Sequence, residues 1–341
     1  MASVNPIGLD IGSSYIRAVE ARRGRFEYAL TNFGQVPLPS GTVQGGVVQD
    51  PHAVTSALKD LWLSAGFHHR HVVLGVTHPQ LVVREMAVSN LPAKELRKSL
   101  PFQVRDMLPL AVDRSLLDFY PLEDPGDSPT VRGLLIATPK DSVLLAVEAI
   151  ERAGLVVDRV DLASFALLRA AARLDAQVEA IVDIGAQVTS MVVHADGEPL
   201  IVRTVPRGGG EITEGIASRL GVQGSEAEEL KCRFGLRGDG RLDGETAATD
   251  AVRPLVNEIR SSFNYLASGE RQKRVTRLAI AGGGALMPGL PEHLHEQLNV
   301  AVVYADNSAR LRDTRRARQR GFDAFLPSAA VSIGLTLGAA A

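Results

Sequence analysis

Residues Ile7–Glu27 read IGLDIGSSYIRAVEARRGRFE, an apolar strand, a Gly/Ser turn and a second strand. This pattern predicts a β-hairpin. Asp10 follows an apolar run, so its side chain should emerge where the first strand leaves the core. The turn after it, Gly12-Ser13-Ser14, has little side chain to block a ligand. We therefore predict that a small charged ligand binds at this turn.

A second stretch, AIVDIGAQVTSMVVHADGEP at residues 180–199, repeats the pattern. Asp183 lies 173 residues after Asp10. When these two aspartates are aligned, Gly12 aligns with Gly185 and Gly24 with Gly197. A repeat of strand, Asp-Ile-Gly turn, strand and glycine turn favours a duplicated lobe over a chance tripeptide. If the lobes face each other around a pseudo-two-fold axis, we expect Asp10 and Asp183 to meet across one cleft.

A third stretch, VTRLAIAGGGALMPGL at residues 275–290, predicts a buried strand, three glycines and a helix. The glycines Gly282, Gly283 and Gly284 allow the backbone to lie flat against a ligand such as a purine or a ribose. The chain has neither G-x-x-x-x-G-K-S/T nor a dinucleotide-binding G-x-G-x-x-G between a strand and a helix. The two hairpins are therefore the predicted phosphate-binding elements.

The composition is that of a globular protein, and 341 residues are enough for two lobes that each bury a core. The 39 acidic and 37 basic residues nearly cancel, so no overall field favours nucleic acid or a membrane surface. The single cysteine, Cys232, excludes an intramolecular disulfide, and residues 1–12 lack the features of a signal peptide. The apolar residues 329–341 are fewer than the ~20 of a membrane helix. We expect a cytoplasmic protein without a nucleic-acid partner.

The three motifs together resemble the phosphate-1, phosphate-2 and adenosine motifs of the actin-like ATPase superfamily. Within that superfamily, the chain is similar to the PilM family of type IV pilus assembly, which is related to FtsA. The segments that carry this likeness are NLPAKELRKSLPFQVRDMLP at 90–109, SFNYLASGE at 262–270, AIAGGGALMPGL at 279–290 and FLPSAAVSIGLTLG at 325–338. The resemblance runs from Ile7 to Gly338.

The resemblance implies an α/β, actin-like ATPase (duplicated ribonuclease H-like) fold with two lobes around a nucleotide cleft. A unit that reads strand, strand, helix, strand, strand interrupts the first lobe without an Asp-Ile-Gly turn of its own, so we expect an inserted subdomain there. The expected segments are 1–71, 139–176 and 322–341 for the first lobe, 72–138 for its inserted subdomain, 177–210 and 275–321 for the second lobe, and 211–274 for the second-lobe subdomain.

The resemblance also assigns ATP and Mg²⁺ to the cleft. Asp10 and Asp183 would each orient waters of the Mg²⁺ ion, which keeps much of its hydration shell beside substrate phosphates. Arg17 stands where the family has lysine, and Tyr15 where it has a third serine, so a planar guanidinium replaces a point charge. The residues implied in nucleotide binding are Gly12, Ser13, Ser14, Arg17, Gly185, Ala186, Thr189, Gly209, Gly210, Glu228, Lys231, Gly282, Gly283 and Gly284.

Several of these assignments have a structural alternative. Asp10 and Asp183 would, in that case, only cap their turns through side-chain hydrogen bonds. The glycines at 208–210 favour either a helix N-terminus whose free N–H groups face the nucleotide or a plain joint between strand and helix. Ser225 and Glu228 have the S-x-x-E spacing of a capping box, which would occupy the glutamate.

By the same resemblance, we expect an ATP-binding adaptor of type IV pilus assembly at the inner face of the cytoplasmic membrane. The implied partner is the N-terminal cytoplasmic tail of the inner-membrane protein PilN, held in a groove that the inserted subdomain helps to form. Other pilus assembly proteins are implied as well, the membrane is reached only through partners, and homo-oligomer formation stays open. Nucleotide state would set lobe closure. No catalytic residue is identified, so we expect weak or no ATPase activity.

Two other functions stay open on the same motifs. A self-polymerising cytoskeletal protein would assemble with ATP. A small-molecule kinase would need a further acid to deprotonate its substrate, and Asp161 is the candidate.

Overall fold

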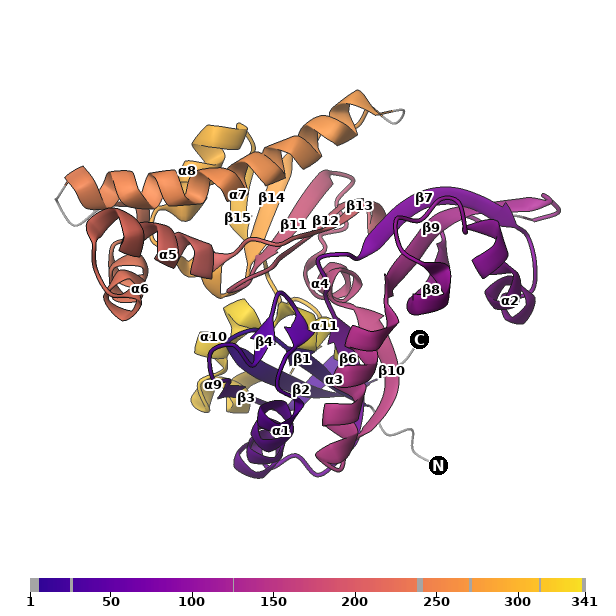
Figure 1. Ribbon diagram of the computed structural model, residues 1–341, viewed down its shortest axis with the longest axis horizontal. Coiled ribbons are helices and arrows are strands. Elements are labelled where there is room, and N and C mark those ends of the chain that lie inside the picture. Colours follow the sequence, from indigo (N-terminus) through magenta and orange to yellow (C-terminus); the bar gives the residue numbers. More distant parts are fainter. Residues whose placement is uncertain are drawn as a thin grey trace.

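The computed structural model describes residues 6–24, 27–124, 126–237, 242–269, 272–312 and 314–338. Residues 1–5 and 339–341, which the sequence assigns to the two ends of the first lobe, lie outside these ranges. The chain has a mixed α/β architecture with two large sheets and a smaller third sheet to one side (Figure 1).

The two large sheets share one strand order. The first runs β10 (Val156–Leu162), β6 (His71–Val76), β1 (Ile7–Ile11), β2 (Tyr15–Arg23), β3 (Tyr28–Pro37) and β16 (Leu311–Arg312). The second runs β15 (Ala301–Tyr304), β14 (Arg277–Ala281), β11 (Val178–Ile184), β12 (Thr189–Ala195) and β13 (Glu198–Val205). In each, the strand that leads into an Asp-Ile-Gly turn pairs antiparallel with the next strand and parallel with a later one. This shared order confirms the predicted duplicated α/β architecture.

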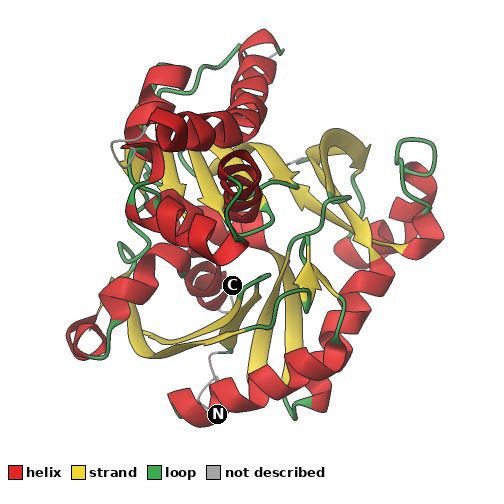
Figure 2. Cartoon of the chain, turned by 60° about the vertical axis from the view of Figure 1, so that its left-hand side comes forward, coloured by secondary structure: helices red, strands yellow, loops and turns green. Residues whose placement is uncertain are grey.

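Helices cover the sheets and also lie between them (Figures 1 and 2). Those packed with the first sheet are α1 (Pro51–Ala65), α3 (Lys140–Arg152), α4 (Ala163–Ala171), α9 (Thr314–Gln319), α10 (Phe322–Phe325) and α11 (Ala330–Gly338). Those packed with the second are α5 (Gly209–Leu220), α6 (Gly224–Arg233), α7 (Leu242–Ser268) and α8 (Leu290–Leu298). Short 3-10 turns are η1 (Val112–Arg114), η2 (Gly235–Arg237), η3 (Gly283–Leu286) and η4 (Leu326–Ser328). Within the described ranges, no helix is both long and apolar enough to cross a membrane.

Helix α4 ties the two sheets together. Its Ala166 lies in one core cluster with Val73 of β6, and its Leu167 lies in another with Ile181 of β11. The two sheets therefore share part of their core through this helix.

Helix α11 is buried along its length, which its small residues permit. The N–H of Gly8 in β1 donates to Thr336 Oγ1 at 3.0 Å, and this hydroxyl donates to the carbonyl of Val19 at 2.7 Å. A Cβ atom at Gly8 would stand 2.1 Å from a carbonyl oxygen of α11, and one at Gly334 would stand 1.8 Å from a carbonyl oxygen of α4. Only glycine fits at these two crossings, which hold α11 directly against the first hairpin at Gly8 and against α4 at Gly334.

The third sheet forms the inserted subdomain. Its order is β7 (Val82–Ser89), β9 (Thr130–Pro139) and β8 (Ser115–Pro121), and helix α2 (Ala93–Gln103) packs on it through Leu100. Both β7 and β8 are edge strands of this sheet.

Two predicted segment boundaries differ from the strand pairing. Residues 72–76, predicted in the inserted subdomain, belong to β6, which pairs with β1 and β10 of the first sheet. A short apolar run such as VVLGV predicts a buried strand, but its periodicity does not say which sheet takes it. Residues 311–312, predicted in the second lobe, form β16, which pairs with β3 of the first sheet.

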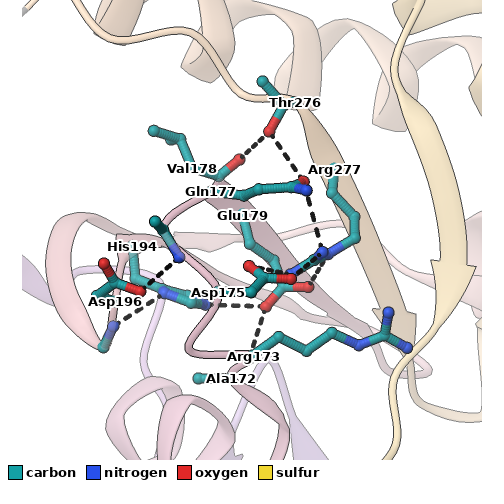
Figure 3. Close-up of polar contacts among 12 residues, drawn as sticks. Ala172, Arg173, Asp175, Gln177, Val178, Glu179, His194, Asp196, Thr276 and Arg277 are labelled. Carbon is teal, nitrogen blue, oxygen red and sulfur yellow. Dashed lines mark hydrogen bonds and ion pairs between the residues drawn. The ribbon is translucent and has the colours of Figure 1, made fainter.

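A buried charged cluster joins β11, β12 and β14 (Figure 3). The Glu179 side chain is fully buried and accepts from Arg277 Nε at 2.6 Å and from His194 Nε2 at 3.0 Å. Because His194 Nδ1 accepts the N–H of Gly197, the neutral ring carries its proton on Nε2 and donates to the carboxylate. Burial alone raises the pKa of Glu179, but the hydrogen bonds from His194 and Arg277 outweigh it and lower that pKa. Arg277 also pairs with Asp175 at 2.7 Å.

We expect Glu179→Ala to lower the free energy of unfolding by about 3 kcal/mol or more, because it leaves the buried Arg277 guanidinium and the buried His194 ring without their fully buried carboxylate partner. Urea denaturation at pH 7 measures this. The matched control is Asp175→Ala, which removes the other partner of Arg277 from a side chain that is 41% exposed. Asp175→Ala should lower the free energy of unfolding by less than about 1 kcal/mol. Equal losses in the two variants would mean that the buried ion pair contributes no more to stability than the exposed one.

Candidate functional site

A cavity of about 610 Å³ lies between the two large sheets. The first lobe contributes the turn between β1 and β2, and the second contributes the turn between β11 and β12 and the glycines after β14. Every predicted site residue except Thr189 lines it. Those residues are Asp10, Gly12, Ser13, Ser14, Arg17, Asp183, Gly185, Ala186, Gly209, Gly210, Glu228, Lys231, Gly282, Gly283 and Gly284.

The two turns have the same geometry. The N–H of Gly12 donates to the carbonyl of Tyr15 at 3.0 Å, and the N–H of Gly185 donates to that of Val188, also at 3.0 Å. Both hairpins also keep one register, since Asp10 pairs with Arg17 and Asp183 with the equivalent residue, Ser190. Local sequence therefore fixes two matching acid-bearing turns, and the fold points both at one cavity.

The two aspartates are close enough to affect each other. Burial raises the pKa of Asp183 to about 7, and the negative charge of Asp10 adds to this rise. Burial also raises the pKa of Asp10, which Arg17 partly opposes. The Arg17 guanidinium lies 4.0 Å from Asp10 and 5.3 Å from the centre of the Tyr15 ring. One guanidinium therefore faces two carboxylates, which leaves the site short of positive charge.

This donor set fits a Mg²⁺ ion held through water. Carboxylates that burial makes costly to ionise gain from a nearby divalent cation, and Mg²⁺ prefers oxygen ligands while keeping several waters. Among the described residues, no group of three or more His, Cys, Asp or Glu side chains is placed to hold a metal ion. Asp10 and Asp183 would thus share the ion with its waters and with ligand oxygens.

The glycines at the start of α5 support the second turn. The N–H groups of Gly209 and Gly210 donate to the carbonyls of Gly185 and Ala186 at 2.8 and 2.7 Å. These two donors are therefore engaged within the protein, and contact of the other N–H groups of this helix start with a nucleotide stays a prediction. A Cβ atom at Gly208 would stand 2.4 Å from the Gly185 oxygen, so the close approach of α5 to the turn requires glycine there.

Lys231 and Glu228 form a polar group on the wall of the cavity. Lys231 is 8% exposed, and its Nζ donates to the carbonyl of Gly209 at 2.9 Å and to Glu228 at 2.7 Å. Burial favours a higher pKa for Glu228, but the hydrogen bonds from Lys231 and Thr213 and the charge of Lys231 together outweigh it and lower that pKa. The capping box with Ser225 does not form, because α6 begins at Gly224 and its N-cap, Gln223, makes no side-chain hydrogen bond.

The glycine run after β14 meets the end of β11. Gly282 has a φ of +87°, and a Cβ atom there would stand 2.3 Å from Asp183 Oδ1. Its N–H donates to the carbonyl of Pro327 at 2.9 Å, just before α11. Glycine at this position therefore lets the backbone of the second lobe pass directly beside the acid.

Thr189 is the predicted residue that lies elsewhere. It is fully buried, and its hydroxyl donates to the carbonyl of Arg207 at 2.8 Å. Asp161, the candidate base of a kinase, lines neither this cavity nor the smaller one beside it. It pairs with Arg169 and accepts the N–H of Leu162.

The cavity also has lining residues that the motifs do not indicate. Gln187 is one of them, and its Oε1 accepts the N–H of Gly45 at 2.8 Å from the small hairpin β4 (Val43–Gln44) and β5 (Val47–Val48). This bond joins the two lobes at the cavity. The others are Ile11, Tyr15, Gly46, Thr77, Ala163, Val188, Ser190, Ile212, Cys232, Leu286, Met287, Ser328 and Val331.

The chain matches one family over nearly its whole length. The model of the family described as Type IV pilus assembly protein PilM matches residues 8–340. A chain in the solved PilM-PilN type IV pilus biogenesis complex is 28% identical to it, with a TM-score of 0.86 over 99% of both chains. Cell division protein FtsA of Streptococcus pneumoniae serotype 2 is 24% identical over an alignment of 353 positions, gaps included, which covers 90% of this chain and 76% of FtsA.

A more distant structure shares the fold. MreB5 of Spiroplasma citri bound to ADP superposes with a TM-score of 0.50 at 12% identity, covering 93% of this chain and 98% of MreB5. Together these likenesses confirm the actin-like ATPase fold.

We expect Asp183→Asn to stabilise the Mg²⁺-free protein increasingly as the pH rises. A carboxyl whose pKa is raised in the folded state favours folding only while protonated, so the wild type loses this stability between about pH 4 and pH 7. The neutral amide of the variant does not ionise and keeps its stability as the pH rises. The free energy of unfolding of the variant, relative to that of the wild type, should therefore increase by about 1–3 kcal/mol between pH 5 and pH 8. Urea denaturation in EDTA measures this.

The control for this pH series is Asp60→Asn on α1, where the aspartate is exposed. Its difference from the wild type should not change with pH. A constant difference for Asp183→Asn would show that Asp183 ionises normally.

Proposed function

The chain belongs to the PilM family of type IV pilus assembly proteins, and from this membership and its cleft we propose that it is an ATP-binding, actin-like adaptor that docks the cytoplasmic tail of PilN. The observation that carries the nucleotide part is the meeting of two equivalent Asp-Ile-Gly turns and a triple-glycine turn in one cavity. The ADP-bound state of MreB5, which has the same fold, supports a nucleotide as the ligand class.

In this proposal, each part of the cavity receives one part of Mg·ATP. Ser13 and Ser14 offer hydroxyls, and their turn offers backbone N–H groups, to the phosphates. Asp10 and Asp183 orient the waters of Mg²⁺, which when bound neutralises phosphate and carboxylate charge. The run 282–284 provides a flat backbone surface for the nucleoside, and Lys231 stands on the wall beside it.

Lobe closure follows because the ligand would touch both lobes at once. A ligand shifts the equilibrium between open and closed forms only by its difference in affinity for them. The proposed contacts come from both sheets, so the closed form would be favoured when the cavity is filled. The bond between Gln187 and Gly45 already joins the lobes in this structure.

We infer weak or no ATPase activity. The carboxylates that line the cavity are Asp10, Asp183 and Glu228. The first two are assigned to Mg²⁺, and Glu228 is bound to Lys231. No carboxylate of the lining therefore stays available to activate a water.

For the partner, the solved complex of a similar chain with PilN supports PilN, and we propose that its N-terminal cytoplasmic tail is the docked part. An extended tail needs apolar pockets and a strand edge. The inserted subdomain offers exposed apolar side chains, since Phe102 and Tyr120 are 76% and 44% exposed, and two strand edges, β7 and β8. We further propose a cytoplasmic location at the membrane that carries PilN, and that residues 211–274 form the second-lobe subdomain.

Isothermal titration calorimetry with Mg·ATP tests the nucleotide part. We expect binding by the wild type, and at least tenfold weaker binding by both Asp10→Ala and Asp183→Ala, because each removes a carboxylate that orients the ion. Asp60→Ala, an exposed acid of α1, should bind as the wild type does. Unchanged affinity in both cavity variants would remove the Mg²⁺ assignment.

The partner part is tested by shortening the inserted subdomain. Val82 pairs with Ala137 across an antiparallel ladder, where opposite Cα atoms are about 5 Å apart, so two glycines can replace residues 83–136. We expect this variant to lose capture of a synthetic PilN tail peptide in calorimetry while it keeps Mg·ATP affinity within about threefold. Undiminished capture would place the docking groove elsewhere.

A further inference from the structure

The start of β2 places an aromatic ring beside a cation of the cavity. Alternate residues of a strand lie on one face of a sheet, so Tyr15 and Arg17 share a face. Asp10 lies opposite Arg17 in the antiparallel register of β1 and β2, and it therefore shares that face. Ile16, between them in the sequence, is buried on the other face, in the core cluster that includes residues of α1 and α3. The alternation thus brings Tyr15, Arg17 and Asp10 to the lining of one cavity.

The Arg17 guanidinium is mostly buried, yet no group of the described residues accepts a hydrogen bond from it. Its side chain is 16% exposed, and the carboxylate of Asp10 pairs with it at 4.0 Å, which is beyond hydrogen-bond distance. A guanidinium carries five N–H donors, and buried donors in native proteins normally have acceptors. The Nε atom is enclosed, so the donors left for a ligand are those of the two terminal nitrogens.

The Tyr15 ring supplies a contact that holds this cation. The centre of the ring lies 5.3 Å from Arg17 Cζ, within the ~6 Å range of a cation–π interaction. The interaction is an attraction between the positive charge and the face of the ring, and it needs no acceptor atom. Tyr15 can therefore fix the place of the guanidinium while the terminal N–H groups stay available.

The guanidinium lies beside the turn that is proposed to receive the phosphates. A Cβ atom at Gly12 would stand 3.8 Å from Arg17 Nη1, so this terminal nitrogen lies next to the turn. The other lysine or arginine of the lining is Lys231, whose Nζ already donates to Glu228. Within the described residues, Arg17 is thus the cation of the lining whose donors have no acceptor in the protein.

We propose that Tyr15 is a positioning residue, which holds the Arg17 guanidinium at the turn so that its terminal N–H groups meet a phosphate group of the ligand. Arginine binds phosphate best through two parallel N–H···O bonds, which require one orientation of its planar group. The ring contact orders the long arginine side chain before the ligand arrives, and this lowers the entropy cost of binding. Tyr15 acts through Arg17 and not through a ligand contact of its own. The inference rests on the proposed nucleotide function.

A double-mutant cycle on Mg·ATP affinity, measured by calorimetry, tests this role. The variants are Tyr15→Ala, Arg17→Ala and the two combined. We expect Tyr15→Ala to weaken binding at least fivefold when Arg17 is present. In the Arg17→Ala protein the same change should alter the affinity less than twofold, because the ring then has no cation to hold. Equal weakening in both backgrounds, or no weakening in either, would overturn the proposal.

Two further variants serve as controls. Tyr15→Phe keeps the ring and should bind Mg·ATP within twofold of the wild type; a loss as large as that of Tyr15→Ala would contradict the ring contact. Tyr265→Ala on α7 removes a ring whose centre lies 5.9 Å from Arg203 Cζ, and neither of these residues lines the cavity. This variant should also bind within twofold of the wild type, and a loss equal to that of Tyr15→Ala would mean that removing any such ring has the same effect.

A second cycle separates this proposal from the nucleotide assignment. In protein free of Mg²⁺ and nucleotide, urea denaturation of the same variants should show coupling of at least threefold in the unfolding equilibrium constant, about 0.7 kcal/mol, because the ring contact exists before a ligand binds. Coupling below threefold would overturn the proposal. If the wild type binds no Mg·ATP, the proposed function fails, and the affinity cycle is repeated with tripolyphosphate. The same pattern with tripolyphosphate would support the role of Tyr15, and a wild type that binds neither ligand would overturn it.

Discussion

The structure holds two mutually repelling carboxylates at its centre. Asp10 and Asp183 end equivalent strands of two sheets and line one cavity, where a single guanidinium, that of Arg17, faces both. Burial and the negative charge of Asp10 raise the pKa of Asp183 to about 7. A cation bound between the two carboxylates would therefore stabilise their ionised forms. Glycine turns leave space around this site, and α4 packs with both sheets beside it.

The sequence predicts the centre of the molecule well because its determinants are local. An Asp-Ile-Gly turn between two apolar strands specifies its own hydrogen bonds, and the closing bond recurs at Gly12 and Gly185. The glycine run after β14 is equally local. What local patterns leave undetermined is which sheet accepts a strand, and so β6 and β16 were predicted in the wrong segments.

The rest of the site could not be predicted because it depends on tertiary contacts. The S-x-x-E spacing suggested a capping box, yet Glu228 turns to Lys231 instead. The N–H groups of Gly209 and Gly210 donate to carbonyls of the turn between β11 and β12, and no sequence pattern in either segment predicts that contact. Gln187 meets Gly45 only because a small hairpin of the first lobe reaches the second. Such residues have a role only after the lobes are assembled, and a single sequence carries no signal for them.

The buried helix α11 sets an order of events during synthesis. Its Thr336 closes hydrogen bonds to Gly8 and Val19, partners made more than 300 residues earlier. The second sheet takes all its strands from residues 178–304, so it can assemble while the last helix is still inside the ribosome. The part of the first sheet that α11 covers, on β1 and β2, stays uncovered until that helix emerges. Chaperone demand on this chain should therefore fall on its earliest-made half.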